Sequence, residues 1–218
     1  RIKSFREAID ESNYPGDSES VDIHIYEAGK IAAWTNESIS AAVAVWRWLG
    51  KHLPNGARTW EEWSGYAENS YSYVLDDTNS SNITQIRNHF SGVKKVARII
   101  GLSGLGKTRL AFEAFRAPED PNDVGQLSRS KQSIYLDASV NSKSLPDIFS
   151  TWRRQGLRGT VIVDNCDPEL HKMLKDEVEH TDSQMNLLTL DFNPERFDSD
   201  HPYIELAQVK DEIIEGII

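Results

Sequence analysis

The sequence predicts an α/β fold from about residue 81 onward, with a parallel sheet of about five strands flanked by helices. Three observations support this prediction. Short apolar runs alternate along the chain with stretches of helical periodicity. A glycine-rich turn joins the first run to the first helix, and a later run ends in an aspartate. A smaller, mainly helical module is expected to precede the sheet.

The predicted strands are short apolar runs at 96–100, 133–136, 160–163, 185–190 and 203–206. Helical periodicity predicts helices at 107–116, 145–154, 168–178 and from 209 onward. Pro118 and Pro121 indicate a loop at 117–123, because proline cannot continue a helix interior. Pro168 is suited to the first turn of its helix.

Residues 1–80 are predicted to form the front module, and residues 81–218 the sheet domain. We expect a short helix at 1–12, a strand at 21–26, and helical structure at 28–53 and from 59. Asn36 or Ser38 is suited to cap the second part of the long helical stretch, and Thr59 the next helix. The polar run 76–82 indicates the boundary between the two domains.

The front module holds five of the six tryptophans, Trp34, Trp46, Trp48, Trp60 and Trp63. Trp46 and Trp48 cannot share one helix face, so we expect one in the core and the other at the surface or a neighbouring domain. A helical adaptor packed against the sheet domain is the favoured interpretation. A base-stacking platform would need accompanying Lys and Arg, and it is disfavoured because this part of the chain is acidic. Glu27 and Lys30 resemble a nuclease site only faintly.

Charge and composition exclude several classes of protein. The net charge of −10 is shared equally: residues 1–93 hold 8 basic and 13 acidic residues, and the rest hold 16 and 21. Neither part has the basic excess of a nucleic-acid-binding surface. No apolar run is long enough for a membrane helix. Cys166 is the single cysteine, so no internal disulfide can form, and we expect a cytoplasmic protein.

Residues 101–108 match the phosphate-binding loop, or P-loop, in which glycine and four further residues precede Gly-Lys-Thr. Glycines let the backbone turn its N–H groups towards phosphate oxygens, and the following helix adds the positive end of its dipole. The expected nucleotide-binding residues are Gly101, Ser103, Gly104, Leu105, Gly106, Lys107, Thr108 and Arg109. Lys107 would contact the β- and γ-phosphates during catalysis, and Thr108 would bind Mg²⁺.

A P-loop also needs a carboxylate at a second strand end to complete the magnesium site. Asp164 and Asp137 both end predicted strands. In P-loop proteins resembling kinases, the aspartate strand neighbours the P-loop strand. In the class related to RecA and AAA+ ATPases, another strand lies between them and the aspartate comes one strand later. Asp164 is therefore the favoured metal ligand.

Asp167 follows Asp164 by three residues and is our candidate for the general base that activates water, with Glu169 as the reserve. The alternative interpretation is that Asp167 caps the helix that starts at Pro168. Both roles can coexist. Cys166 between the two acids is interpreted as a small buried residue rather than a reactive thiol.

Four segments resemble the STAND class of signal-transducing P-loop ATPases, which contains the NACHT and NB-ARC regulators. Residues 97–111 look like their P-loop, and 164–167 resemble their second motif. Residues 185–190 resemble the strand that senses the γ-phosphate, and 203–206 the strand that leads into a helical lid. Bacterial members of antiviral defence look most similar. This sequence departs from the pattern with Asn165 after the aspartate and with Asp191-Phe192 where many members have an arginine.

The resemblance implies a slow, Mg²⁺-dependent ATPase that acts as a molecular switch, with ADP bound at rest and ATP in the active state. It also implies an effector controlled through self-association, and a ligand sensed by a region that the sequence does not reveal. Because the chain begins without methionine and ends in an apolar stretch, we expect a piece of a longer protein, cut before the lid. An AAA+-like mechanical ATPase, a small-molecule phosphotransferase using Asp137, and a regulator that binds nucleotide without hydrolysis are the alternatives.

Overall fold

The computed structural model describes residues 2–12, 21–51, 53–54, 56–65, 73–192 and 203–206 of the 218-residue chain. The chain divides into a front unit, residues 1–34, and a sheet unit, residues 35–218. The helix expected from residue 209 onward lies outside the described residues.

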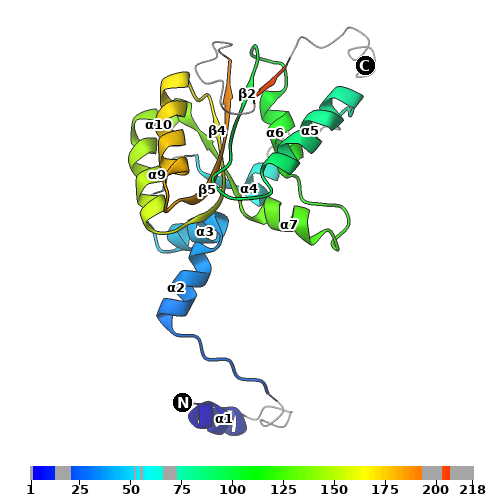
Figure 1. Ribbon diagram of the computed structural model, residues 1–218. Helices are drawn as coiled ribbons and strands as arrows, with labels where there is room; N and C mark the ends of the chain where they lie inside the picture. The colour runs from blue at the N-terminus through cyan, green and yellow to red at the C-terminus, as the bar shows by residue number, and fades with distance from the viewer. Residues whose placement is uncertain are drawn as a thin grey trace. The chain divides into compact units, whose positions relative to one another are not determined.

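A six-stranded sheet in the order β1-β3-β4-β5-β2-β6 forms the centre of the sheet unit (Figure 1). Its strands are β1 (Arg58–Thr59), β2 (Val96–Ile100), β3 (Ser133–Asp137), β4 (Arg158–Asp164), β5 (Gln184–Asp191) and β6 (Tyr203–Glu205). Neighbouring strands run parallel, except that β1 pairs antiparallel with β3. The predicted α/β class with five parallel strands is confirmed, and β1 adds a short antiparallel edge.

The strand order matches the expectation for the class related to RecA and AAA+ ATPases. β2, which leads into the glycine-rich loop, pairs with β5 on one side and β6 on the other. β4, which ends at Asp164, pairs with β5 and β3. β5 therefore lies between the loop strand and the aspartate strand. Because the strands are parallel, their carboxyl ends share one edge of the sheet, where open α/β sheets bind ligands.

Helices cover both faces of the sheet, as Figure 1 shows. On one face lie α3 (Ile39–Trp48), α9 (Leu145–Arg154) and α10 (Pro168–Glu179), whose apolar residues share a core with alternate strand residues. On the other face lie α4 (Trp60–Ser64), α5 (Asp77–His89) and α6 (Lys107–Phe115), which form a second core. α8 (Ala138–Asn141) and the 3₁₀ turn Ser142–Ser144 connect β3 to α9.

Besides the four-residue α8, two helices were not predicted from the sequence, because their buried faces are small or polar. α5 begins after Asp76, whose side chain accepts from the Asn79 N–H, and it lies where a polar joint was expected. It buries only two apolar side chains, Ile83 and Ile86. α7 (Val124–Lys131) buries Gln126 and Ser130 instead of apolar residues. Neither helix therefore has a clear hydrophobic period.

The structure divides the chain after Trp34, rather than near residue 80 where composition placed the boundary. Residues 35–65 belong to the sheet unit because they complete both of its cores. Ile39 of α3 is fully buried on one face, and Trp63 of α4 is 1% exposed on the other. The sequence alone could not show that this segment belongs to the sheet unit, because polar turns at both of its ends look like domain boundaries.

The caps predicted for this segment are confirmed in part. Ser38, rather than Asn36, caps α3, and Thr59 forms a capping box with Glu62 at the start of α4. The predicted contrast between the two tryptophans of α3 is also confirmed. Trp46 packs against the core, whereas Trp48 is 85% exposed.

The front unit contains α1 (Ile2–Glu11), which the sequence predicted, and most of α2 (Ala28–Asn36). The strand predicted at 21–26 is wrong, since residues 22–27 have no regular secondary structure. An alternating pattern forms a strand only where a neighbouring strand can pair with it. Tyr26 instead lies against Trp34, with ring centroids 5.8 Å apart.

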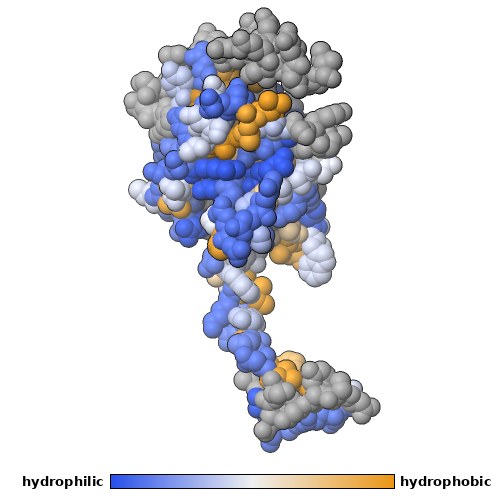
Figure 2. All heavy atoms as spheres, turned by 90° about the vertical axis from the view of Figure 1, so that its right-hand side faces the viewer, coloured by the Kyte–Doolittle hydropathy of each residue, from blue (hydrophilic) through white to orange (hydrophobic). Residues whose placement is uncertain are grey.

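The face of the molecule shown in Figure 2 is mostly hydrophilic, with a few apolar patches. It is the side of the sheet unit on which α5 and α7 lie in Figure 1. Among the helices described, none combines the length and the apolar character needed to span a bilayer.

Candidate nucleotide site

The glycine-rich loop runs from the end of β2 to the start of α6 and has the backbone shape that its glycines permit. Gly104 and Gly106 have φ angles of 84° and 82°, in the left-handed region that favours glycine. Within this loop, no side chain caps the start of α6. The first N–H groups of the helix are therefore available to an anion, which the helix dipole also favours.

Gly101 is required for a different reason, the close approach of a neighbouring segment. A Cβ atom at this position would lie 2.9 Å from the carbonyl oxygen of Leu206, which follows β6. The Leu206 N–H donates to the Ile100 carbonyl at 2.9 Å, and the Gly101 N–H donates to the Asp191 carbonyl at 3.2 Å. Residues from β5 and beyond β6 therefore hold the beginning of the loop on both sides.

Lys107 lies at the first position of α6 and folds its side chain over the loop. Its ammonium donates to the carbonyl oxygens of Gly101 and Leu102, at 2.8 Å each. Partial burial lowers the pKa of this ammonium, while the carboxylates Asp164 and Asp191 act in the opposite direction. Both carboxylates are thus near enough to interact electrostatically with Lys107.

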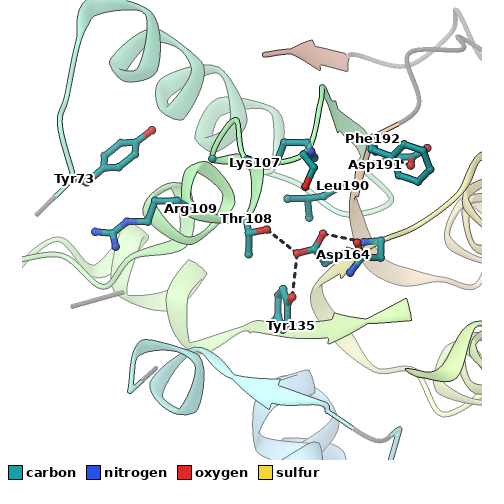
Figure 3. A pocket seen from close by; sticks show the side chains of 13 residues that line it. Tyr73, Lys107, Thr108, Arg109, Tyr135, Asp164, Leu190, Asp191 and Phe192 are labelled. Atoms are coloured by element: carbon teal, nitrogen blue, oxygen red, sulfur yellow. Dashed lines mark hydrogen bonds between the residues drawn. The ribbon is translucent and has the colours of Figure 1, made fainter. Parts of the chain in front are cut away.

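Asp164 lies beside the loop and receives three hydrogen bonds (Figure 3). Thr108 Oγ1 donates to Asp164 Oδ2 at 2.7 Å, and Tyr135 Oη donates to the same oxygen at 3.0 Å. The N–H of Asn165 donates to Asp164 Oδ1 at 2.8 Å. Asn165 has a φ of 55°, a left-handed turn that Asn adopts more readily than most residues. The strand end thus aims the carboxylate at the loop hydroxyl.

Asp137, the other candidate for the metal site, is engaged elsewhere. It pairs in register with Asp164, one strand farther from the loop. Its Oδ1 accepts from the N–H and the hydroxyl of Ser139 and from the side-chain amide of Asn165. Although partial burial opposes it, these hydrogen bonds hold the pKa of Asp137 below its usual value. Its carboxylate caps α8 and does not line the loop cavity.

A buried ion pair lies at the end of β5, where the resemblance led us to compare Asp191 with an arginine. Arg98 of β2 donates to Asp191 Oδ2 at 2.9 Å, and the Asp191 side chain is 1% exposed. Arg98 also approaches the Cys166 carbonyl at 3.5 Å. The positive charge at the end of β5 thus comes from Arg98 of β2, and it is paired with Asp191.

Asp167 caps α10, since its Oδ1 accepts from the N–H of Leu170 at 2.8 Å. Pro168 occupies the first turn of that helix, as predicted. Neither Asp167 nor Glu169 is among the residues described around the loop cavity. Cys166 is fully buried, and burial raises the pKa of its thiol, in agreement with its interpretation as an unreactive core residue.

A cavity of about 700 Å³ lies against the loop. Six of the predicted phosphate- and metal-binding residues line it: Ser103, Gly104, Gly106, Lys107, Thr108 and Asp164. Arg109, predicted to bind the nucleotide, lines it as well, whereas Gly101 and Leu105 shape the loop without lining the cavity. The other lining residues are Tyr73, Tyr135, Asn165, Leu190, Asp191 and Phe192.

Sequence reasoning missed Tyr73 and Tyr135 as members of the site. Tyr73 precedes α5 and lies beside Arg109, whose guanidinium is 5.5 Å from the ring centroid. Burial raises the pKa of Tyr73 to about 12, with further contributions from Glu113 and Asp76. The tyrosines belong to no motif, so only the position of Tyr135 two residues before the end of an apolar strand could have indicated it.

Solved structures similar to this chain include the following two. One is PCH-2 of C. elegans, with 15% identity over 66% of this chain and 46% of that chain, at a TM-score of 0.41. The other is a STAND protein with a tetratricopeptide repeat sensor from Pyrococcus horikoshii, with 16% identity over 64% of this chain and 24% of that chain, at a TM-score of 0.36. No protein-family model and no curated protein matches the chain. The fold assignment therefore rests on the strand order and the loop geometry.

Proposed function

We propose that the sheet unit binds a nucleoside triphosphate, ATP by the resemblance, together with Mg²⁺. One observation carries this proposal: the 2.7 Å hydrogen bond from Thr108 Oγ1 to Asp164 Oδ2. It brings a loop hydroxyl and a carboxylate from a strand two places away to one point beside a phosphate-binding loop. A glycine-rich turn that does not bind nucleotide would have no need of a carboxylate such as Asp164 beside its threonine.

The loop backbone and Lys107 are suited to the phosphates. The Lys107 ammonium makes two hydrogen bonds to loop carbonyls, and phosphate oxygens could replace these acceptors without moving the helix. Gly104 and Gly106 turn the backbone so that the start of α6 faces the cavity. Lys107 would thereby hold the terminal phosphates and stabilise the charge that develops on them during transfer.

The donor set near Asp164 is suited to Mg²⁺, which prefers oxygen ligands. The Thr108 hydroxyl oxygen and the Asp164 carboxylate would hold the ion, and Asn165 would keep the carboxylate oriented through its N–H. When bound, Mg²⁺ would neutralise phosphate charge and favour departure of the γ-phosphate. Asp137 is farther along the sheet and caps α8, so we assign it no metal.

Tyr73 and Arg109 mark the part of the cavity where we propose that the nucleoside binds. Figure 3 shows them on the side of Thr108 opposite to Leu190, Asp191 and Phe192. An aromatic ring beside a guanidinium offers a flat surface on which a base can stack. Arg109 keeps its charge paired through Glu113, at 2.8 Å. ATP rather than GTP is an implication of the resemblance.

We propose that hydrolysis is slow. Asp167 is our proposed general base, yet its carboxylate is hydrogen-bonded to the Leu170 N–H. Activating water would require it to turn away from this cap, which costs about 1 kcal/mol of helix stability. Slow turnover suits a switch that must remain in one nucleotide state. We propose such a STAND-type switch in cytoplasmic signalling or antiviral defence, controlling an effector by nucleotide-dependent self-association.

The test is to measure copurified nucleotide, ADP and ATP affinity, and turnover of the purified protein. Lys107→Ala should weaken nucleotide binding by about 10- to 100-fold, because a charge-assisted contact to phosphate is lost. Lys172→Ala, on the exposed face of α10, is the matched control and should bind normally. Bound ADP with slow turnover supports the switch, whereas fast turnover favours a mechanical ATPase. Absence of any nucleotide binding by the unaltered protein would refute the proposal.

A further inference from the structure

Tyr135 is a buried tyrosine of β3 whose hydroxyl reaches the metal-site carboxylate from the side opposite to the loop. Its Oη donates to Asp164 Oδ2 at 3.0 Å, and Thr108 Oγ1 donates to the same oxygen at 2.7 Å. Figure 3 shows Tyr135 and Thr108 approaching Asp164 from β3 and α6, respectively. One carboxylate oxygen is therefore held between two hydroxyl groups from separate elements.

The two hydroxyls cannot have the same role once a metal is present. The oxygen of Thr108 has to face the metal, so its orientation depends on the ion. Tyr135 has no such second role, because the residue is buried, 7% exposed, and its hydroxyl donates to Asp164.

The Tyr135 ring packs against β1 and α4, a segment far from β3 in the chain. Trp63 of α4 stacks on the ring, with centroids 4.5 Å apart and planes at 23°. Arg58 of β1 pairs with Tyr135 in register, and its guanidinium lies 5.8 Å from the ring centroid. Trp63 also packs edge-on against Phe112 of α6, the helix that carries Thr108. The β1–α4 segment, residues 58–64, thus contacts Tyr135 and the helix that carries Thr108.

We propose that Tyr135 is a positioning residue that holds Asp164 for Mg²⁺, and that residues 58–64 set its position. This inference rests on the proposed function, because it concerns the metal that accompanies the nucleotide. A shift of β1 or α4 would move the Tyr135 hydroxyl and change the affinity for Mg²⁺–nucleotide without touching the phosphate loop. The segment would therefore couple a movement of β1 or α4 to the metal site.

Tyr135→Phe is the variant that tests this inference, because it removes one hydroxyl and keeps the ring that stacks on Trp63. Affinity for a fluorescent ADP analogue is measured in EDTA and in saturating Mg²⁺. We expect the affinity in EDTA to be unchanged, and the gain from Mg²⁺ to fall about tenfold, the lower end for loss of an outer partner of a metal ligand. Tyr26→Phe, the same chemical change in the front unit, is the matched control.

A double-mutant cycle with Asp164→Asn separates positioning from a general structural effect. In that background the Mg²⁺-dependent gain is already lost, so Tyr135→Phe should change nothing further. An unaltered Mg²⁺ gain in Tyr135→Phe would overturn the inference and leave the proposed function standing. An equal loss in EDTA and in Mg²⁺ would also overturn it, since it would indicate a change in the whole cavity. If the unaltered protein showed no Mg²⁺-dependent binding, the proposed function itself would fail.

Discussion

The carboxyl ends of β3, β4 and β5 carry aspartates of the same kind in very different surroundings. Asp164 on β4 receives the hydroxyls of Thr108 and Tyr135 beside the glycine-rich loop. Asp137 on β3, its partner in register, caps α8 and bonds to Asn165. Asp191 on β5 is buried and paired with Arg98. Neighbouring acids on one sheet edge thus have three separate environments.

This difference shows that the place of a strand in the sheet, rather than the sequence at its end, decides what its acid contacts. β5 lies next to the loop strand, so its acid is close enough to pair with a residue of β2. β4 lies one place farther and meets the first turn of α6, which begins at the loop. β3 lies beyond both, and its acid caps α8 and accepts from Asn165.

The largest expected effect on stability follows from removing Asp191, the buried acid of β5. Comparing this loss with that from removing Asp137 of β3 tests how much their surroundings differ. Asp191→Ala leaves the Arg98 guanidinium buried without its carboxylate and should lower the free energy of unfolding by about 3–5 kcal/mol. Asp137→Ala removes only a helix cap and should cost about 1 kcal/mol. Urea denaturation measures both. Equal losses would show that the pairing of Asp191 with Arg98 contributes little.

A second test concerns Asp167, which lies three residues after Asp164. Asn caps helices as well as Asp does, but it cannot accept a proton at neutral pH. If Asp167 is the general base, Asp167→Asn should reduce ATP turnover about 100-fold, with unfolding and ADP binding unchanged. Asp167→Ala should in addition lose about 1 kcal/mol of stability. Normal turnover in the Asn variant would leave Asp167 with the capping role alone.

The contrast between β4 and β3 can be tested by replacing the aspartate at the end of each strand with asparagine. Asp164→Asn should reduce the Mg²⁺-dependent gain in nucleotide affinity by about 10- to 100-fold. Asp137→Asn, an identical change on the neighbouring strand, should have little effect, since its carboxylate caps α8. Titration of Mg²⁺ at fixed ADP measures this gain. The reverse result, with Asp137 essential, would favour a phosphotransferase and contradict our assignment of the metal site.

Most of the sheet could be predicted from the sequence, because buried parallel strands are continuous apolar runs. β2 and α9 occur as predicted, and β4 and β5 extend the predicted runs by one or two residues at their ends. The phosphate loop could also be predicted, since its glycines are required locally by left-handed φ angles and by the close approach of Leu206. These features depend on neighbours in the chain or on burial alone.

The remaining features depend on contacts between distant segments. The strand predicted at 21–26 lacks a partner strand in the structure, whereas the two-residue β1 forms because β3 offers it an edge. The membership of residues 35–65 in the sheet unit depends on where Ile39 and Trp63 are buried. Tyr73 and Tyr135 line the cavity because of residues distant in the chain, and apart from the place of Tyr135 in its strand, no local pattern marks either of them.

The sequence by itself determined that this protein has a glycine-rich loop with the P-loop pattern between a strand and a helix, because glycine, lysine and threonine impose that geometry within a few residues. The sequence favoured Asp164 over Asp137, but the different surroundings of Asp137, Asp164 and Asp191 depended on the tertiary structure. Insertion of β5 between β2 and β4 sets the distance of each acid from the loop. Strand order is fixed by hydrogen bonds and side-chain packing across the whole sheet, and a single strand does not carry that information.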